Sequence, residues 1–385
     1  MFLRIVFFCF YCFFFVFSQF VFAQKNIYEK FKQKYPQESA IMLDKKERIL
    51  IEINDGKLKI SNSHYVDKLL LSESQNYADE YIHFSNTFSE IQDIDACILT
   101  IDGKKYKKMP VTNIETKSEF QAGIFYDDTK IKHIIYPKVE IGSRAVISYN
   151  EIINDPHFLG AFYFSSYMPL ENSEFSVSVP AEVKINYKVF HDQHKKIRFS
   201  QKKEGKNVVY TWKAENMEKY NFEDDAPSIS HYVPHIVIYI DEYLKEGKTQ
   251  KVLSNVHELF SWYQFLVKDI NKNIDGNLKI LVDSLVLNAK TDQERTQKIF
   301  YWVQDHIKYV AFEDGMSGFV PTEAAKVCSR RYGDCKDMAS ITTQMLNMAG
   351  IPASLTWIGS RALPYSYSSL CLWECPRVLF KEKRL

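Results

Sequence analysis

The sequence is poor in three features that often narrow a protein's function: net charge, cysteine, and histidine in its last part. Its 385 residues contain 49 Lys and Arg against 48 Asp and Glu, so the formal net charge is +1. Such a balance creates no field that would gather nucleic acid or an anionic membrane surface, and we expect neither as a partner. The composition is otherwise that of a globular protein, with 46% hydrophobic and 25% charged residues.

Long apolar runs are missing too, except at the amino terminus. Arg4 precedes an unbroken apolar stretch over residues 5–17, and Val21-Phe22-Ala23 is typical of a signal-peptidase site. We therefore interpret residues 1–23 as a signal peptide, which would place the rest in the periplasm, the cell envelope or the extracellular space. The alternative is an uncleaved anchor, because the stretch nearly reaches the ~20 residues that span a bilayer.

Cysteine is scarce, and its number after the leader is odd. The remaining cysteines are Cys97, Cys328, Cys335, Cys371 and Cys375. Export permits disulfides, and Cys371 and Cys375 could pair or be incidental. Cys97 is interpreted as a small core residue. The spacing does not fit a zinc ribbon, and nothing in the sequence implies a metal or an organic cofactor.

Short strands dominate the first half of the chain. Residues 24–40 are interpreted as a polar lead-in segment, and residues 41–225 contain many alternating segments separated by turn signals. Asp55-Gly56 and Asp102-Gly103 each follow such a segment, and an Asp-Gly pair tolerates the positive φ of a tight hairpin turn. This pattern predicts an antiparallel β-sandwich domain.

The pattern changes after a breaker-rich stretch over residues 221–234, and we interpret residues 226–250 as the connector. Residues 251–385 have a helical period, so the whole chain is predicted to be of the α+β class. Thr291 to Glu294 forms a capping-box pattern for a helix that should end near His306. A second helix is predicted over 334–349, and a strand over 353–358.

Cys335 lies where that second helix should begin. A thiol at a helix amino terminus meets the positive end of the backbone dipole and unpaired N–H groups, which favour the thiolate and make the sulfur a nucleophile. Asp334 and Asp337 are expected to cap the helix rather than to catalyse. All ten histidines precede Cys335, so the base that usually activates such a sulfur does not follow it.

Three segments resemble the transglutaminase-like superfamily. They are the run Tyr332-Gly333-Asp334-Cys335-Lys336-Asp337, the end of the following helix at Ala349-Gly350-Ile351-Pro352, and residues 361–367. The strands before them resemble the exported bacterial branch in which a DUF3857-type β-sandwich precedes this core. The resemblance covers residues 40 to about 369 and implies a papain-like core acting on peptide or protein amides. Cys335 would be the catalytic nucleophile that forms a thioester, and its own N–H would lie in the oxyanion hole. An incoming amine would give transglutamination, and water would give hydrolysis.

The sequence departs from this family after residue 369. Relatives have a histidine and later an acidic residue on strands that follow, whereas residues 370–385 contain no histidine and no strand alternation. We interpret the domain over 251–385 as C-terminally truncated with an atypical tail, and expect it to be inactive in this form. His231, His235 and His306 are the earlier histidines considered as substitutes.

A further expectation follows from a truncated core. Met338, Ile341 and Met345 on the cysteine helix should be partly uncovered, because strands that would pack on them are missing.

The alternative function is a non-catalytic binding or structural module of the cell envelope, in which the β-sandwich recognises a protein or a glycan.

Overall fold

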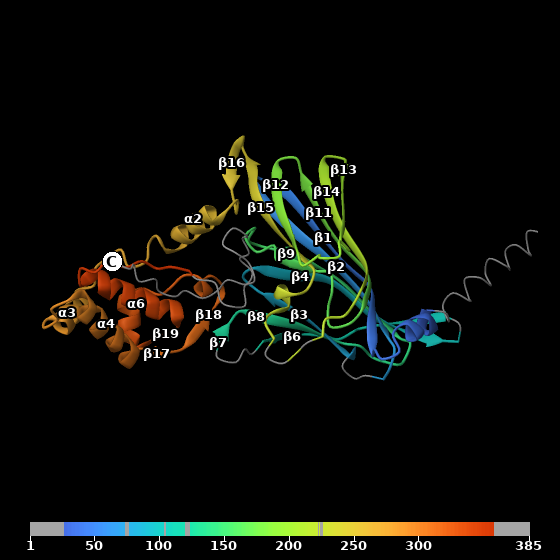
Figure 1. The fold of residues 1–385 in the computed structure, drawn as a ribbon, viewed down its shortest axis with the longest axis horizontal. Helices are drawn as coiled ribbons and strands as arrows, with labels where there is room; N and C mark the ends of the chain where they lie inside the picture. The colour runs from blue at the N-terminus through green and yellow to red at the C-terminus, as the bar shows by residue number, and fades with distance from the viewer. Residues whose placement is uncertain are drawn as a thin grey trace, which may run out of the picture.

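The computed structural model describes residues 27–73, 77–103, 105–119, 124–221, 223 and 226–357. A large β domain and a smaller, mainly helical region lie side by side, with the short strands β7 Ile124–Asp127 and β18 Ala311–Glu313 between them (Figure 1). The predicted α+β class is confirmed. The leader, the tail after residue 357, Cys371 and Cys375 lie outside the described residues.

The β domain is built on one large sheet. Its strands are β1 Ala40–Asn54, β2 Lys57–Leu70, β4 Ser89–Asp102, β5 Lys105–Pro110, β9 Arg144–Ile153, β11 Leu170–Pro180, β13 Arg198–Glu204 and β14 Asn207–Met217. They lie in the order β13-β14-β11-β1-β2-β9-β4-β5. The predicted Asp-Gly hairpin between β1 and β2 is present, with Asp55 at φ 51° and Gly56 at φ 68°. Both residues therefore have the left-handed conformation that a type I′ turn requires.

Two smaller sheets cover one face of this large sheet. One contains β10 Ala161–Tyr163, β12 Val183–Phe190, β15 His235–Lys245 and β16 Lys248–Lys251, and the other β3 Asp79–Ser85, β6 Ile114–Ser118 and β8 Thr129–Ile135. Ile60 of β2 packs in the core that includes Ile238 of the first, and Leu70 of β2 packs with Ile82 of the second. Because alternate residues of a strand share a face, both smaller sheets lie on the same side of β2.

The lead-in segment adds a helix on the opposite side. Residues 27–34 are helical, and Phe31 packs against Ile41, Leu69 and Leu71. Leu69 and Leu71 alternate with Leu70, so this helix covers the other face of the large sheet.

Two details of the predicted sandwich were wrong. The large sheet is mixed rather than purely antiparallel, because β1 pairs with β11 in parallel. The β domain also continues past the predicted connector, since β15 pairs with β12 and β10 and thus brings residues 235–245 into the second sheet. Residues 226–250 therefore hold the 3₁₀ helix η2 Ile229–His231, the largely buried strand β15 and most of β16 rather than a simple linker.

Short helices and strands form the second region. They are α2 Val256–Val267, α3 Gly276–Val286, α4 Asp292–His306, β17 Lys308–Tyr309, β18, η3 Gly315–Gly318, α5 Ala324–Arg330, β19 Tyr332–Gly333 and α6 Cys335–Met348. The helix that ends at His306 is confirmed, and its N-cap Thr291 accepts a hydrogen bond from the Glu294 N–H at 3.1 Å. None of the helices in the described ranges has the length and apolar composition needed to cross a membrane.

The core of this region packs around α6. Ile341 and Met345 are completely buried against side chains of α3, α4 and α5, and only Met338 keeps partial exposure. The expectation that Ile341 and Met345 would be uncovered was therefore wrong, because neighbouring helices supply the packing. The predicted strand over 353–358 was also wrong for its described part, where Trp357 alone makes a single bridge.

Candidate functional site

The cysteine site begins with the cap of α6. Asp334 is the N-cap residue, and its carboxylate accepts a hydrogen bond from the Asp337 N–H at 3.2 Å. The Asp337 carboxylate in turn accepts from the Asp334 N–H at 3.4 Å, which completes a capping box. Cys335 is thus the first residue of the helix, and the expected capping role of Asp334 and Asp337 is confirmed.

A ring of buried charges fixes this helix end to its surroundings. Asp337 accepts a hydrogen bond from the Thr322 N–H at 2.7 Å and forms an ion pair with Arg330 at 2.5 Å. Lys336 is buried and pairs with Asp334. A Cβ at Gly333 would lie 2.6 Å from the Asp337 Cβ, so the strand before the cysteine approaches the helix as closely as glycine permits. The cysteine is therefore held on a rigid turn.

The Cys335 thiol is half-buried, and its surroundings favour the neutral form. Burial raises the pKa of Cys335, and the carboxylates of Asp334 and Glu313 raise it further, while Lys336 opposes them. The helix terminus alone was expected to favour the thiolate, and the structure gives the opposite direction. Desolvation and two nearby carboxylates outweigh the amino end of one helix.

Tyr309 brings a phenol to the same sulfur from β17. Burial raises the pKa of Tyr309, and the neighbouring Cys335, Asp334 and Glu313 raise it further, the cysteine also through a side-chain hydrogen bond. The phenol therefore keeps its proton at neutral pH. Both the Cys335 thiol and the Tyr309 phenol are therefore neutral, and we call this unactivated state of the cysteine the resting state.

The histidines considered as substitutes have partners elsewhere. His306 is exposed, its Nδ1 lies 2.9 Å from the Trp302 carbonyl oxygen, and its ring stacks on Trp302. His235 is buried in β15 with its Nδ1 2.7 Å from the Val233 carbonyl oxygen, and burial lowers its pKa to about 4. His231 lies beside Tyr232. In the part of the chain that the structure describes, no hydrogen bond or ion pair joins Cys335 to a histidine.

The other described cysteines do not lie at the start of a helix, since Cys97 is within β4 and Cys328 within α5. Cys97 is buried in the β domain, as predicted, and Cys328 on α5 is half-buried, and both are free. Within the described ranges, no group of three or more His, Cys, Asp or Glu side chains is arranged to hold a metal ion.

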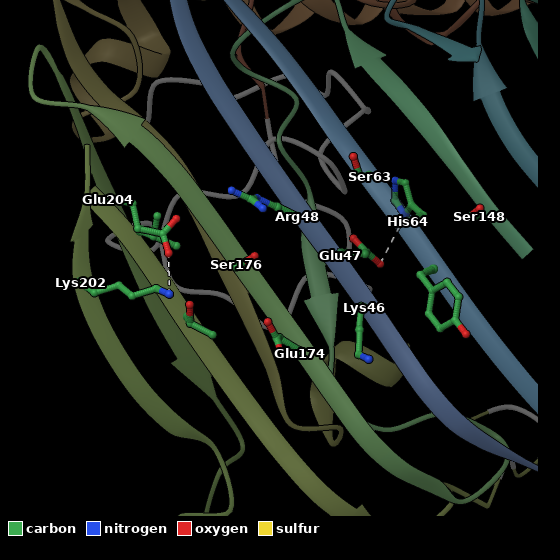
Figure 2. A pocket seen from close by; sticks show the side chains of 13 residues that line it. Lys46, Glu47, Arg48, Ser63, His64, Ser148, Glu174, Ser176, Lys202 and Glu204 are labelled. Carbon is green, nitrogen blue, oxygen red and sulfur yellow. Dashed lines mark ion pairs between the residues drawn. The ribbon is translucent and has the colours of Figure 1, made fainter. Parts of the chain in front are cut away.

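A second candidate site is a polar groove of about 410 Å³ on the large sheet. Figure 2 shows its labelled side chains, which come from β1, β2, β9, β11 and β13. The lining combines Lys46, Arg48 and Lys202 with Glu174 and Glu204, and Lys202 pairs with Glu204 at 2.5 Å. The sequence reasoning missed this groove, because it is assembled from strands far apart in the chain.

Comparison with known proteins agrees with this architecture. Residues 57–221 match the model of DUF3857, a domain of unknown function with a solved structure, and residues 279–358 match the transglutaminase-like superfamily core. A crystal structure of a "putative protease" from Parabacteroides distasonis is similar to 88% of this chain, with a TM-score of 0.66 and 15% sequence identity. The match spans 64% of that protein's length. No curated protein matches the sequence. Residues 57–221 are thus similar to the DUF3857 domain and residues 279–358 to the transglutaminase-like superfamily core, and the fold of the chain is similar to that of the Parabacteroides distasonis protein.

Proposed function

We propose that this chain is an exported transglutaminase-like protein in which Cys335 forms a thioester with peptide or protein amides. The observation that carries the proposal is the place of Cys335 as the first residue of α6, half-buried rather than sealed in the core. The apolar leader of residues 1–23 supports export.

The chemistry that this position supports is acyl transfer. The sulfur would add to the amide carbonyl carbon, and backbone N–H groups at the start of α6 would stabilise the oxyanion. Collapse of the tetrahedral intermediate would break the C–N bond and release the amine with the thiol proton, leaving a thioester. Water or a second amine would then take the acyl group and restore the thiol.

The structure supports a low rate for residues 1–385 acting alone. The thiol is neutral, and no described histidine contacts it to take its proton. We therefore infer that an activated ester acylates Cys335, whereas an ordinary amide reacts too slowly to be turned over.

The test is acylation by p-nitrophenyl acetate, followed by peptide mass spectrometry at early times. We expect an acetyl adduct on the peptide that contains Cys335 and none at that position in Cys335→Ala. Release of ammonia from a glutamine peptide should not exceed that of the Cys335→Ala control. An adduct confined to Cys328 would refute the nucleophile, and rapid amide turnover would refute the resting state.

The groove of Figure 2 favours a second candidate, a non-catalytic envelope module. Its mixed charges and hydroxyl groups suit a polar ligand such as a glycan. Co-sedimentation of the full chain with cell-envelope polysaccharide should then be lost in Arg48→Glu and retained in Cys335→Ala. Failure of the chain to sediment with the polysaccharide would remove this candidate.

A further inference from the structure

One extended segment touches both the cysteine turn and the β domain. At its start, β17 pairs in parallel with β19, and the Val310 N–H donates to the Gly333 carbonyl oxygen at 3.0 Å. At its end, β18 pairs in parallel with β7 of the β domain, with Phe312 opposite Tyr126. Figure 1 shows β7 and β18 side by side between the two parts of the molecule. The segment therefore links the strand before Cys335 directly to the DUF3857 region.

Asp128, just after β7, anchors the far end of this segment. One carboxylate oxygen accepts the Gly315 N–H at 3.2 Å, and the other accepts the Thr87 N–H at 2.9 Å and the Ser85 hydroxyl at 2.5 Å. Asp128 is only 8% exposed. Although burial opposes ionisation, the hydrogen bonds from Ser85, Thr87 and Gly315 lower the pKa of Asp128. A charged carboxylate thus connects the β domain to η3.

The backbone at Gly315 fits this contact closely. Gly315 has φ +52°, and a Cβ at this position would overlap the Thr87 side chain. Only glycine allows the segment to approach the β domain this closely without strain.

Aromatic rings extend the same contact. Phe319, after η3, lies 5.8 Å from the Phe88 ring and 5.5 Å from the Phe158 ring of the β domain. Trp262 of α2 lies 5.8 Å from Phe319, and the ring of His157 stacks on Trp262. The segment is therefore held to the β domain by the pairing of β18 with β7, by the hydrogen bond from Gly315 to Asp128 and by apolar packing beside it.

The segment carries the side chains that surround the thiol. Tyr309 and Glu313 both act on Cys335; Tyr309 lies on β17, which pairs with β19, and Glu313 lies on β18, which pairs with β7 of the β domain. Releasing the contact at Asp128 would let these side chains move away from the sulfur.

We propose that the DUF3857 region shapes the Cys335 site, with Asp128 as the positioning residue that holds the segment from β17 to η3 against the thiol. The importance of Asp128 for catalysis rests on the proposed function of Cys335. The positioning of the segment by Asp128 does not depend on that function. The β domain would then be part of the thiol site rather than an independent module.

The experiment measures the iodoacetamide labelling rates of Cys335 and Cys328 in the same sample of the full chain at about pH 9, near the ordinary pKa of a thiol. We expect Asp128→Ala to raise the Cys335 rate by about threefold or more and to leave the Cys328 rate unchanged. Asp128→Asn keeps a carbonyl acceptor and should lie between wild type and Asp128→Ala. Asp95→Asn, which removes an exposed ion pair on β4, is the matched control and should equal wild type.

Gly315→Ala changes the other partner of the contact between Gly315 and Asp128. It replaces Asp128→Ala in the experiment if that variant does not fold. It should also raise the Cys335 rate. Unchanged Cys335 rates in a folded Asp128 or Gly315 variant would overturn the proposal. If these variants raise the Cys335 labelling rate but p-nitrophenyl acetate does not acetylate Cys335, the positioning role stands and the nucleophile is refuted. If Cys335 is acetylated but its labelling rate is unchanged in the variants, the nucleophile stands and the positioning role is refuted.

Discussion

His64 provides the sharpest test of the energetics of the β domain. The order β1-β2-β9 places its ring between Glu47, 3.6 Å from Nδ1, and Glu151, 3.4 Å from Nε2, while Tyr149 stacks on it at 4.4 Å. Figure 2 shows the pair of His64 and Glu47. Burial alone would lower the pKa of His64, but the two carboxylates raise it from 6.5 to about 9. Burial likewise opposes ionisation of Glu47, yet His64 lowers its pKa from 4.5 to about 2.

These shifts fix how the stability depends on pH. The folded state keeps a proton on His64 that the unfolded chain releases, so this contribution is complete below pH 6.5 and is lost as the pH rises through about 9. The contribution of Glu47 is complete above pH 4.5 and is lost as the pH falls toward about 2. The shift of His64 corresponds to about 3 kcal/mol, and the shift of Glu47 reports largely the same interaction and is not added to it.

The perturbation is His64→Gln, and the assay is urea unfolding followed by circular dichroism. The variant should lose about 3 kcal/mol of unfolding free energy near pH 6, and much less near pH 10, where His64 of the wild type is neutral. His83→Gln is the control, because His83 is 55% exposed in its ion pair with Glu119 and should cost under about 0.5 kcal/mol. An equal loss for His64→Gln at both pH values would refute the reasoning.

Three other substitutions are tested by urea unfolding, two in the cysteine region and one in the β1–β2 turn of the β domain. Asp337→Ala should cost about 3 kcal/mol, because it leaves the half-buried Thr322 N–H and the Arg330 guanidinium without their acceptor; a loss below 1 kcal/mol would contradict the capping network. Ile341→Ala should cost about 2–5 kcal/mol, whereas Ile280→Ala on the exposed face of α3, 69% exposed, should cost under about 1 kcal/mol; similar losses would show that α6 is not the core helix. Gly56→Ala should cost about 1 kcal/mol, because φ is +68° in the β1–β2 turn; no loss would mean a different turn.

Local signals in the sequence predicted the elements that depend on nearby residues. The Asp-Gly turn after β1, the Thr291 cap of α4 and the Asp334 cap of α6 each require contacts within a few residues. The residue types at these positions are enough to predict such contacts. The hairpin and the helix starts, including the one at Cys335, therefore lie where the sequence predicts them.

Long-range pairings could not be predicted in the same way. The parallel pairing of β1 with β11 and of β18 with β7 joins strands more than 100 residues apart, and no turn residue marks either one. The protonation of Cys335 likewise depends on residues distant in the sequence, because Tyr309 and Glu313 reach the sulfur only in the folded chain. The sequence predicts the helix start whose dipole lowers the pKa of the Cys335 thiol, but it does not predict the burial that raises this pKa.

The most direct test of the account is the pH dependence of iodoacetamide labelling at Cys335, resolved from Cys328 by peptide mass spectrometry. Because burial and nearby carboxylates keep the thiol neutral, we predict slow labelling at neutral pH and a rate that rises with an apparent pKa above the ordinary value of a thiol. A rate that is already maximal at neutral pH would show an activated thiolate, and no labelling at any pH would show a sealed cysteine. Either result would contradict a half-buried, resting nucleophile at the start of α6.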